Sequence, residues 1–143
     1  MLSGLFETRY NELSFEDIQF AIKNSENFLL INTLEVENQK CLISTTMNIN
    51  NEERIMNELL SEYNVNSKKI IIYGKNSCDK SIRVKYKQLL KLGFQHLYLY
   101  EGGMFEWLCL QDIYGKEEFP TTSKELDLLK YKVKKTFGNY LLT

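Results

Sequence analysis

The chain has 143 residues, 43% of them hydrophobic and 26% charged, with a formal net charge of −1. This composition is typical of one folded globular domain, and it excludes a disordered or low-complexity chain. No apolar run approaches the roughly 20 residues of a membrane span, and the first residues lack the apolar core of a secretory signal. We therefore expect a cytoplasmic protein that makes no contact with a membrane.

Three cysteines, Cys41, Cys78 and Cys109, are scattered along the chain, and none belongs to a C-x-x-C pair. This spacing predicts no disulfide framework. Because His96 is the only histidine, a structural zinc site is not predicted either. We expect neither a metal nor a cofactor.

Positive charge is concentrated in the middle of the chain. Residues 68–91 contain eight Lys or Arg and a single Asp, whereas residues 1–67 contain 11 Asp or Glu and four Lys or Arg. Such a block is commonly the solvated face of a helix, and the alternative is a surface that attracts an anion or an acidic protein. The net charge of the whole chain is close to zero and no nucleic-acid motif is present, and both observations argue against nucleic-acid binding.

A second basic stretch lies near the C-terminus, where Lys130, Lys132, Lys134 and Lys135 are interleaved with apolar residues. This alternation predicts an edge strand or an extended arm that binds an acidic partner. None of these patterns predicts the oligomeric state.

Helix and strand signals alternate in the first half of the chain. Residues 14–17 resemble a capping box, and apolar residues follow at helical spacing, so a helix is predicted over about 15–24. Residues 28–31 form a short apolar run typical of a buried strand, and residues 41–43 predict a shorter second strand. An Asn-x-x-Glu pattern then predicts a helix over about 50–62.

The strongest strand prediction is the Ile-Ile-Ile-Tyr run at 70–73, which the polar loop 74–80 follows. A helix is predicted over about 80–91, and Gly93 stands where a left-handed cap residue is expected. The remaining predicted elements are a strand over 96–100, a turn at 102–103, a helix over 104–110 and a C-terminal helix after a Thr122–Glu125 capping box.

Helices that alternate with buried strands predict crossover connections and a mainly parallel sheet flanked by helices on both faces. We predict that the strands at 28–32, 70–73 and 96–100 are adjacent and parallel. Ligands of such sheets gather at the carboxyl ends of the strands. Any chemistry is therefore expected where three loops meet, namely 32–39, 74–80 and 101–105.

Four stretches, in order, resemble a rhodanese-like domain. They are Leu-Leu-Ile-Asn at 29–32, the segment 41–49, Ile-Ile-Ile-Tyr at 70–73, and Leu-Gly-Phe at 92–94 followed by Glu-Gly-Gly-Met-Phe-Glu-Trp at 101–107. The resemblance implies an α/β, rhodanese-like three-layer domain. Its expected boundaries are an N-terminal extension over 1–13, the domain over 14–120, and a C-terminal helix with a basic tail over 121–143.

For active members, the resemblance implies a catalytic cysteine directly after the central strand. The N–H groups of the next loop surround the sulfur and stabilise a thiolate, a persulfide or a bound oxyanion, which suits sulfur transfer or phosphate-ester cleavage. In this chain Gly74 stands at the cysteine position. Asn32 also replaces the usual Asp, and residues 42–44 lack the usual His and Pro.

Two hypotheses follow. The first is a non-catalytic interaction module, a pseudoenzyme whose cationic loop binds a small anion, such as sulfate or phosphate, or an acidic protein partner. The second is a sulfurtransferase in which Cys78 forms the persulfide, or, as the less favoured alternative, a phosphatase-like enzyme with Cys78 as the nucleophile, since nearby Lys75 and Lys80 would stabilise its thiolate. Gly74 favours the first, and we expect little or no sulfur transfer from thiosulfate to cyanide. The candidate anion-binding residues are Gly74, Lys75, Asn76, Ser77, Asp79, Lys80 and Ser81.

Overall fold

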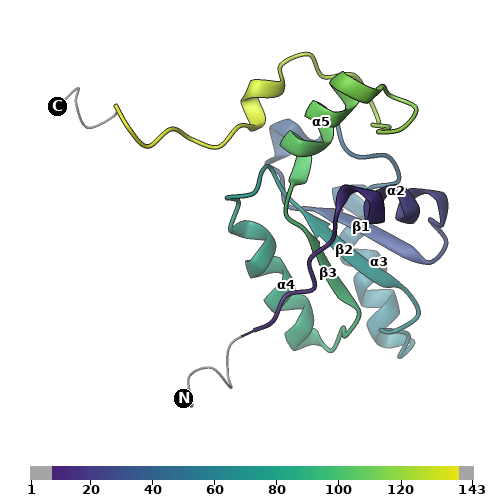
Figure 1. Cartoon of the computed structure of the whole chain (residues 1–143). Helices are drawn as coiled ribbons and strands as arrows, with labels where there is room; N and C mark the ends of the chain where they lie inside the picture. The colour runs from purple at the N-terminus through teal and green to yellow at the C-terminus, as the bar shows by residue number, and fades with distance from the viewer. Residues whose placement is uncertain (1–7, 139–143) are drawn as a thin grey trace.

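The three apolar runs predicted as strands form a parallel sheet in the computed structural model, which describes residues 8–138 (Figure 1). The strands are β1 (Phe28–Asn32), β2 (Lys69–Tyr73) and β3 (Leu97–Tyr100), and they lie side by side in that order. Both neighbouring pairs are parallel, with β2 in the centre. The predicted adjacent, parallel strands are confirmed.

One face of the sheet packs against α2 (Phe15–Lys23) and α5 (Gly103–Tyr114). Leu30 and Ile71 point to this face and join a buried cluster that includes Trp107 of α5. Because strand side chains alternate between the two faces, the neighbouring positions contribute to a different core.

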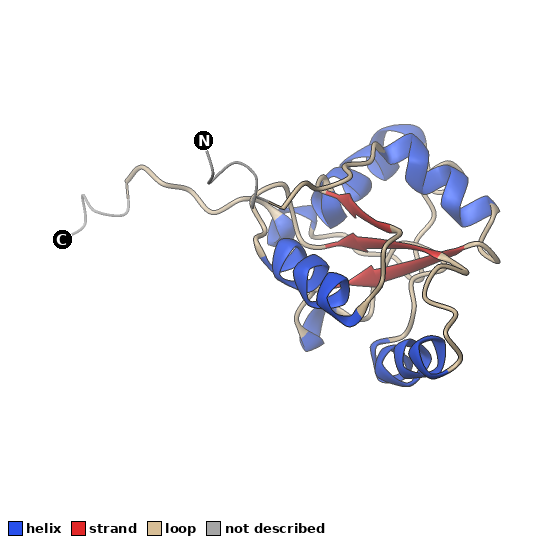
Figure 2. Cartoon of the chain, turned by 90° about the horizontal axis from the view of Figure 1, so that it is seen from below, coloured by secondary structure: helices blue, strands red, loops and turns tan. Residues whose placement is uncertain are grey.

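The opposite face packs against α3 (Ile49–Ser61) and α4 (Ser81–Leu92). Ile31 and Ile72 lie in this second cluster together with Met56 of α3. Figure 2 shows the helices on both sides of the strands, so the fold has three layers. A sheet buried on both faces explains why its strands read as continuous apolar runs.

Short irregular segments cover both edges of the sheet. At the β3 edge, Leu99 donates its N–H to the carbonyl of Asn11 at 2.8 Å and accepts the N–H of Leu13 at 2.8 Å. At the β1 edge, Met47 donates its N–H to the carbonyl of Leu30 at 2.8 Å. These contacts satisfy backbone groups that would otherwise be left open to another chain.

The strand predicted over 41–43 is wrong. Ile43 makes only an isolated antiparallel bridge with Thr121. Its N–H donates to the phenol oxygen of Tyr73 at 3.2 Å, and the chain turns two residues later at Thr45, whose φ is 69°. A side chain from β2 therefore takes the hydrogen bond that a neighbouring strand would have made.

Two of the four predicted helix caps are present. The Ser14 capping box is present, with its hydroxyl accepting the N–H of Asp17, and Gly93 ends α4 with a φ of 111°. The start predicted at Asn50 is wrong, because Asn48 is the cap and its Oδ1 accepts the N–H of Asn50 at 2.8 Å. Over residues 8–138, no helix combines the length and apolar character needed to cross a membrane.

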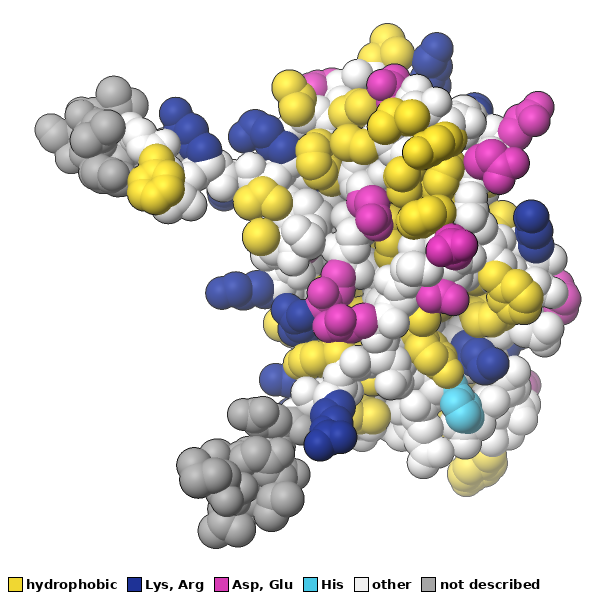
Figure 3. All heavy atoms as spheres, in the orientation of Figure 1, with side chains coloured by type: hydrophobic (Ala, Val, Ile, Leu, Met, Phe, Trp, Pro, Cys, Tyr) yellow, Lys and Arg dark blue, Asp and Glu magenta, His cyan; other side chains and the backbone are white. Residues whose placement is uncertain are grey.

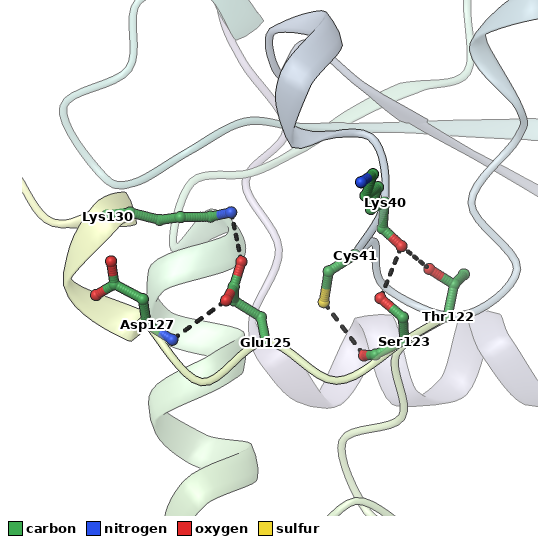
Figure 4. Close-up of polar contacts among 7 residues, drawn as sticks. All are labelled: Lys40, Cys41, Thr122, Ser123, Glu125, Asp127 and Lys130. Carbon is green, nitrogen blue, oxygen red and sulfur yellow. Dashed lines mark hydrogen bonds and ion pairs between the residues drawn. The ribbon is translucent and has the colours of Figure 1, made fainter.

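The predicted C-terminal helix is reduced to η2 (Leu128–Tyr131), a single 3₁₀ turn. Thr122 and Glu125 do not form the predicted capping box (Figure 4). Instead, the Thr122 hydroxyl donates to the carbonyl of Lys40 at 3.2 Å, and Glu125 pairs with Lys130. Contacts with a distant loop therefore override the local capping pattern.

Three fully buried tyrosines make the stability of the fold sensitive to alkaline pH. Burial raises the pKa of the Tyr73, Tyr100 and Tyr131 phenols above their ordinary value. A raised folded-state pKa contributes stability that is present below the unfolded-state pKa and is lost as the pH rises toward the folded-state value. We expect the free energy of unfolding to fall progressively above about pH 10, the ordinary tyrosine pKa.

Urea unfolding measured at increasing pH checks this expectation. The control is Tyr63→Phe, because the Tyr63 side chain is 91% exposed. This variant should keep the pH dependence of the wild type, whereas Tyr73→Phe should weaken it. A free energy of unfolding that does not change above about pH 10 would contradict the prediction.

Candidate functional site

The predicted meeting of loops lies at the carboxyl edge of the sheet, where loop 74–80 connects β2 to α4. The N–H of Thr33, just after β1, donates to the carbonyl of Tyr73 at 3.0 Å. The N–H of Met104, in the first turn of α5, donates to the carbonyl of Gly74 at 3.0 Å. Segments that follow all three strands therefore converge on this loop.

Gly103 allows α5 to approach the loop closely. Its φ is +65°, and a Cβ at this position would lie 2.6 Å from the carbonyl oxygen of Gly74. The N–H of Phe105 also reaches the loop and donates to the carbonyl of Lys75 at 2.9 Å. The first turn of α5 thus fixes the backbone of the loop at two successive residues.

The carboxylate of Asp79 occupies the inside of the loop. Its Oδ2 accepts the N–H of Lys75 at 2.8 Å, and its Oδ1 accepts the N–H of Ser81 at 3.0 Å and the Ser81 hydroxyl at 2.6 Å. A Cβ at Gly74 would lie 2.4 Å from Asp79 Oδ2. The space that a side chain at Gly74 would take is therefore filled by a carboxylate of the same loop.

Asn76 connects the loop to the C-terminal segment. Its side chain is buried, with Oδ1 accepting the N–H of Cys78 at 2.9 Å and Nδ2 donating to the carbonyl of Tyr131 at 2.9 Å. Tyr131 is itself fully buried. The chain that leaves η2 is consequently held beside the loop.

Cys78 lies on the exposed side of the loop and lines a cavity of about 670 Å³. We call this space the cationic cavity, because four lysines also line it: Lys75, Lys80, Lys132 and Lys134. The other predicted loop residues that line the cavity are Asn76, Asp79 and Ser81. Two predicted residues do not line it, because Gly74 is buried and the exposed Ser77 lies outside the cavity.

The sequence did not indicate that Lys132 and Lys134 belong to the same site as the loop. Their only signal was the alternation of lysine with apolar residues, which predicted an arm but not its position. Figure 3 shows basic side chains along the C-terminal segment and on the neighbouring side of the molecule. Within residues 8–138, none of the four lysines is ion-paired with a carboxylate. The described residues also contain no cluster of three His, Cys, Asp or Glu suited to a metal ion.

The family model of the rhodanese-like domain matches residues 5–109. The chain therefore belongs to the rhodanese-like domain family. A search of curated proteins found no match.

Three solved structures share the fold of this chain. The BH2092 protein from Bacillus halodurans is 17% identical, with 85% of this chain and 90% of that chain covered and a TM-score of 0.56. Alr3790 from Anabaena sp. is 18% identical, with 80% and 95% covered and a TM-score of 0.54. Ygr203w, described as a yeast protein tyrosine phosphatase of the Rhodanese family, is 16% identical, with 85% and 98% covered and a TM-score of 0.56.

Proposed function

We propose that this rhodanese-like domain is a non-catalytic binding module. The observation that carries the proposal is the position of Asp79, whose carboxylate lies where a side chain at Gly74 would project. The family resemblance places the catalytic cysteine of active members at Gly74. In this chain a carboxylate takes the place of the reactive sulfur.

The same carboxylate uses the hydrogen-bond donors that a sulfur-transfer site requires. The N–H groups of Lys75 and Ser81 both donate to Asp79. A thiolate, a persulfide or an oxyanion at this point would lack those donors, and the carboxylate would repel its negative charge. The loop retains the backbone framework of an anion site but already holds an internal anion.

The ligand of the proposed module binds above the loop rather than inside it. The cationic cavity presents lysine side chains from the loop and from the C-terminal segment, and such a surface favours an acidic ligand. Both a small anion and an acidic protein partner fit this chemistry. Contact is made through lysine ammonium groups, because the Lys75 and Ser81 amides are engaged by Asp79.

Sulfur transfer by Cys78 is the second candidate, because this exposed thiol lines the cationic cavity together with Lys75 and Lys80. In that reaction the Cys78 thiolate attacks the outer sulfur of thiosulfate, a new S–S bond forms and sulfite leaves. Cyanide then attacks the outer sulfur, so that thiocyanate leaves and the thiolate is restored. Cys78 would perform both steps outside the loop amides that Asp79 occupies.

Turnover assays separate the two candidates. For purified protein we expect transfer of sulfur from thiosulfate to cyanide at the background rate, unchanged in Cys78→Ser. A phosphate-ester substrate should also remain uncleaved, and this assay is included because one structural neighbour is described as a phosphatase. Robust turnover that Cys78→Ser abolishes would refute the non-catalytic proposal.

An engineered pair tests the role assigned to Asp79. The Gly74→Cys/Asp79→Ala variant should form a thiosulfate-derived persulfide on the introduced thiol that mass spectrometry detects, because a sulfur then replaces the carboxylate. Gly74→Cys alone should form much less, since Asp79 still competes for the same donors. Both variants carry Cys78→Ser so that the native loop thiol cannot react in place of the introduced one. Equal persulfide yields would show that the carboxylate does not block the loop.

A further inference from the structure

We infer that a groove beside the loop binds an extended acidic peptide of a partner protein, with its acidic residues in the cationic cavity and an apolar side chain between Ile49 and Val84. This inference rests on the proposed function and names the partner class. It combines two cavities that the proposed function does not connect.

The second cavity, of about 370 Å³, adjoins the cationic cavity. Thr33, Leu34 and Ser81 line both spaces, so the two cavities are adjacent, and we call the pair, which extends from the loop toward α3, the groove. At its far end stand the apolar side chains of Ile49 and Val84, which are 41% and 56% exposed. We call this end the apolar cavity.

The charges at the two ends of the groove differ. Four lysines and two carboxylates, those of Glu35 and Asp79, line the cationic cavity, and the Asp79 carboxylate is engaged by backbone amides. In the apolar cavity Lys85 is neutralised by Glu52 at 2.6 Å. A ligand that complements both ends is acidic at one end and apolar at the other.

The two ends together favour a peptide over a nucleic acid. Neither cavity is lined by an aromatic side chain on which a base could stack. A half-exposed Ile49–Val84 surface suits an aliphatic side chain, whereas a phosphodiester would place charge on it. A peptide carries both chemistries on one chain.

Lys132 and Lys134 give the inference its specific test. Both lysines line the cationic cavity, and both are exposed. The variant Lys132→Glu/Lys134→Glu reverses the charge at the two arm positions that line the cationic cavity and leaves the loop unchanged. Lys116→Glu/Lys124→Glu makes the same charge change beside a different cavity and serves as the control.

The probe is a fluorescent peptide with one glutamate for each of the four lysines, a short serine spacer and a leucine, and binding is measured by fluorescence anisotropy with the full chain. We expect the arm variant to weaken binding by about tenfold and the control variant by less than about twofold. The inference would be overturned if the arm variant and the control variant lost peptide affinity equally, or if the wild type did not bind the peptide. If the wild type does not bind the peptide and its sulfur transfer stays at the background rate, the inference fails but the non-catalytic proposal still stands.

The apolar end is tested with Val84→Ser and a second peptide in which serine replaces leucine. Val84→Ser should weaken binding of the leucine peptide by about threefold and leave the serine peptide nearly unchanged. Equal effects on both peptides would refute contact at the apolar cavity. Single-stranded RNA that binds as tightly as the leucine peptide would refute the peptide as the preferred ligand.

Discussion

Replacing Gly103 with alanine should lower the free energy of unfolding by about 2–5 kcal/mol, as the sum of backbone strain and overpacking. The left-handed φ of +65° is costly for a residue with a Cβ, and that Cβ would lie 2.6 Å from the carbonyl oxygen of Gly74. Relief of the clash requires the first turn of α5 to move away from the loop. This movement would break the hydrogen bond from Met104 N–H to Gly74.

Gly93→Ala is the matched control for this substitution. Gly93 also has a positive φ, of +111°, but no atom outside its immediate chain neighbours lies within 4 Å of the position that a Cβ would take. Urea unfolding of both variants therefore separates backbone strain from close packing. We expect the Gly93 variant to lose about 1–2 kcal/mol and the Gly103 variant to lose more. A larger loss in the Gly93 variant would show that the contact between α5 and the loop is not tightly packed.

Removing the Asp79 carboxylate should lower the free energy of unfolding by about 2–3 kcal/mol, because hydrogen bonds to charged groups are among the stronger ones. Asp79→Ala leaves the N–H groups of Lys75 and Ser81 without their acceptors. Gly74→Ala should have a similar effect by a different route. Its Cβ would lie 2.4 Å from Asp79 Oδ2 and would displace the carboxylate from the loop.

A double-mutant cycle of these substitutions tests whether they act on the same interaction. Once Asp79→Ala has removed the carboxylate, adding Gly74→Ala should cost only about 1 kcal/mol or less, so the two effects should be strongly non-additive. Urea unfolding of the four proteins measures the coupling. Additive losses would mean that the carboxylate does not fill the space in front of Gly74.

The sheet could be predicted from the sequence because its strands are buried on both faces. Residues 28–31 and 70–73 are continuous apolar runs, and helices on both faces of the sheet bury most of these side chains. Segment 41–43 is also apolar but forms no strand, because Ile43 donates its N–H to the Tyr73 phenol and turns toward Thr121. Local pattern cannot reveal a hydrogen bond to a side chain thirty residues away.

Part of the hydrogen bonding within loop 74–80 could be predicted from the sequence, and part could not. Two side chains in the loop accept the backbone N–H of the residue two positions later. They are Asn76, which accepts from Cys78, and Asp79, which accepts from Ser81. This short-range pattern is visible in the sequence and is typical of Asx turns. The bond from Asp79 back to Lys75 and the bond from Asn76 to Tyr131 depend on the folded path of the chain. They could not be predicted from spacing.

The residues that follow the matched region 5–109 supply part of the hydrophobic core. Phe119 and Tyr131 are 3% and 0% exposed, and the indole N–H of Trp107 donates to the carbonyl of Pro120 at 3.1 Å. A fragment cut at the family boundary would lose these apolar side chains and leave the Trp107 indole without its acceptor. We therefore expect a fragment that ends at residue 109 to be less stable than the full chain, and we expect domain swaps with other rhodanese-like proteins to need junctions beyond Tyr131.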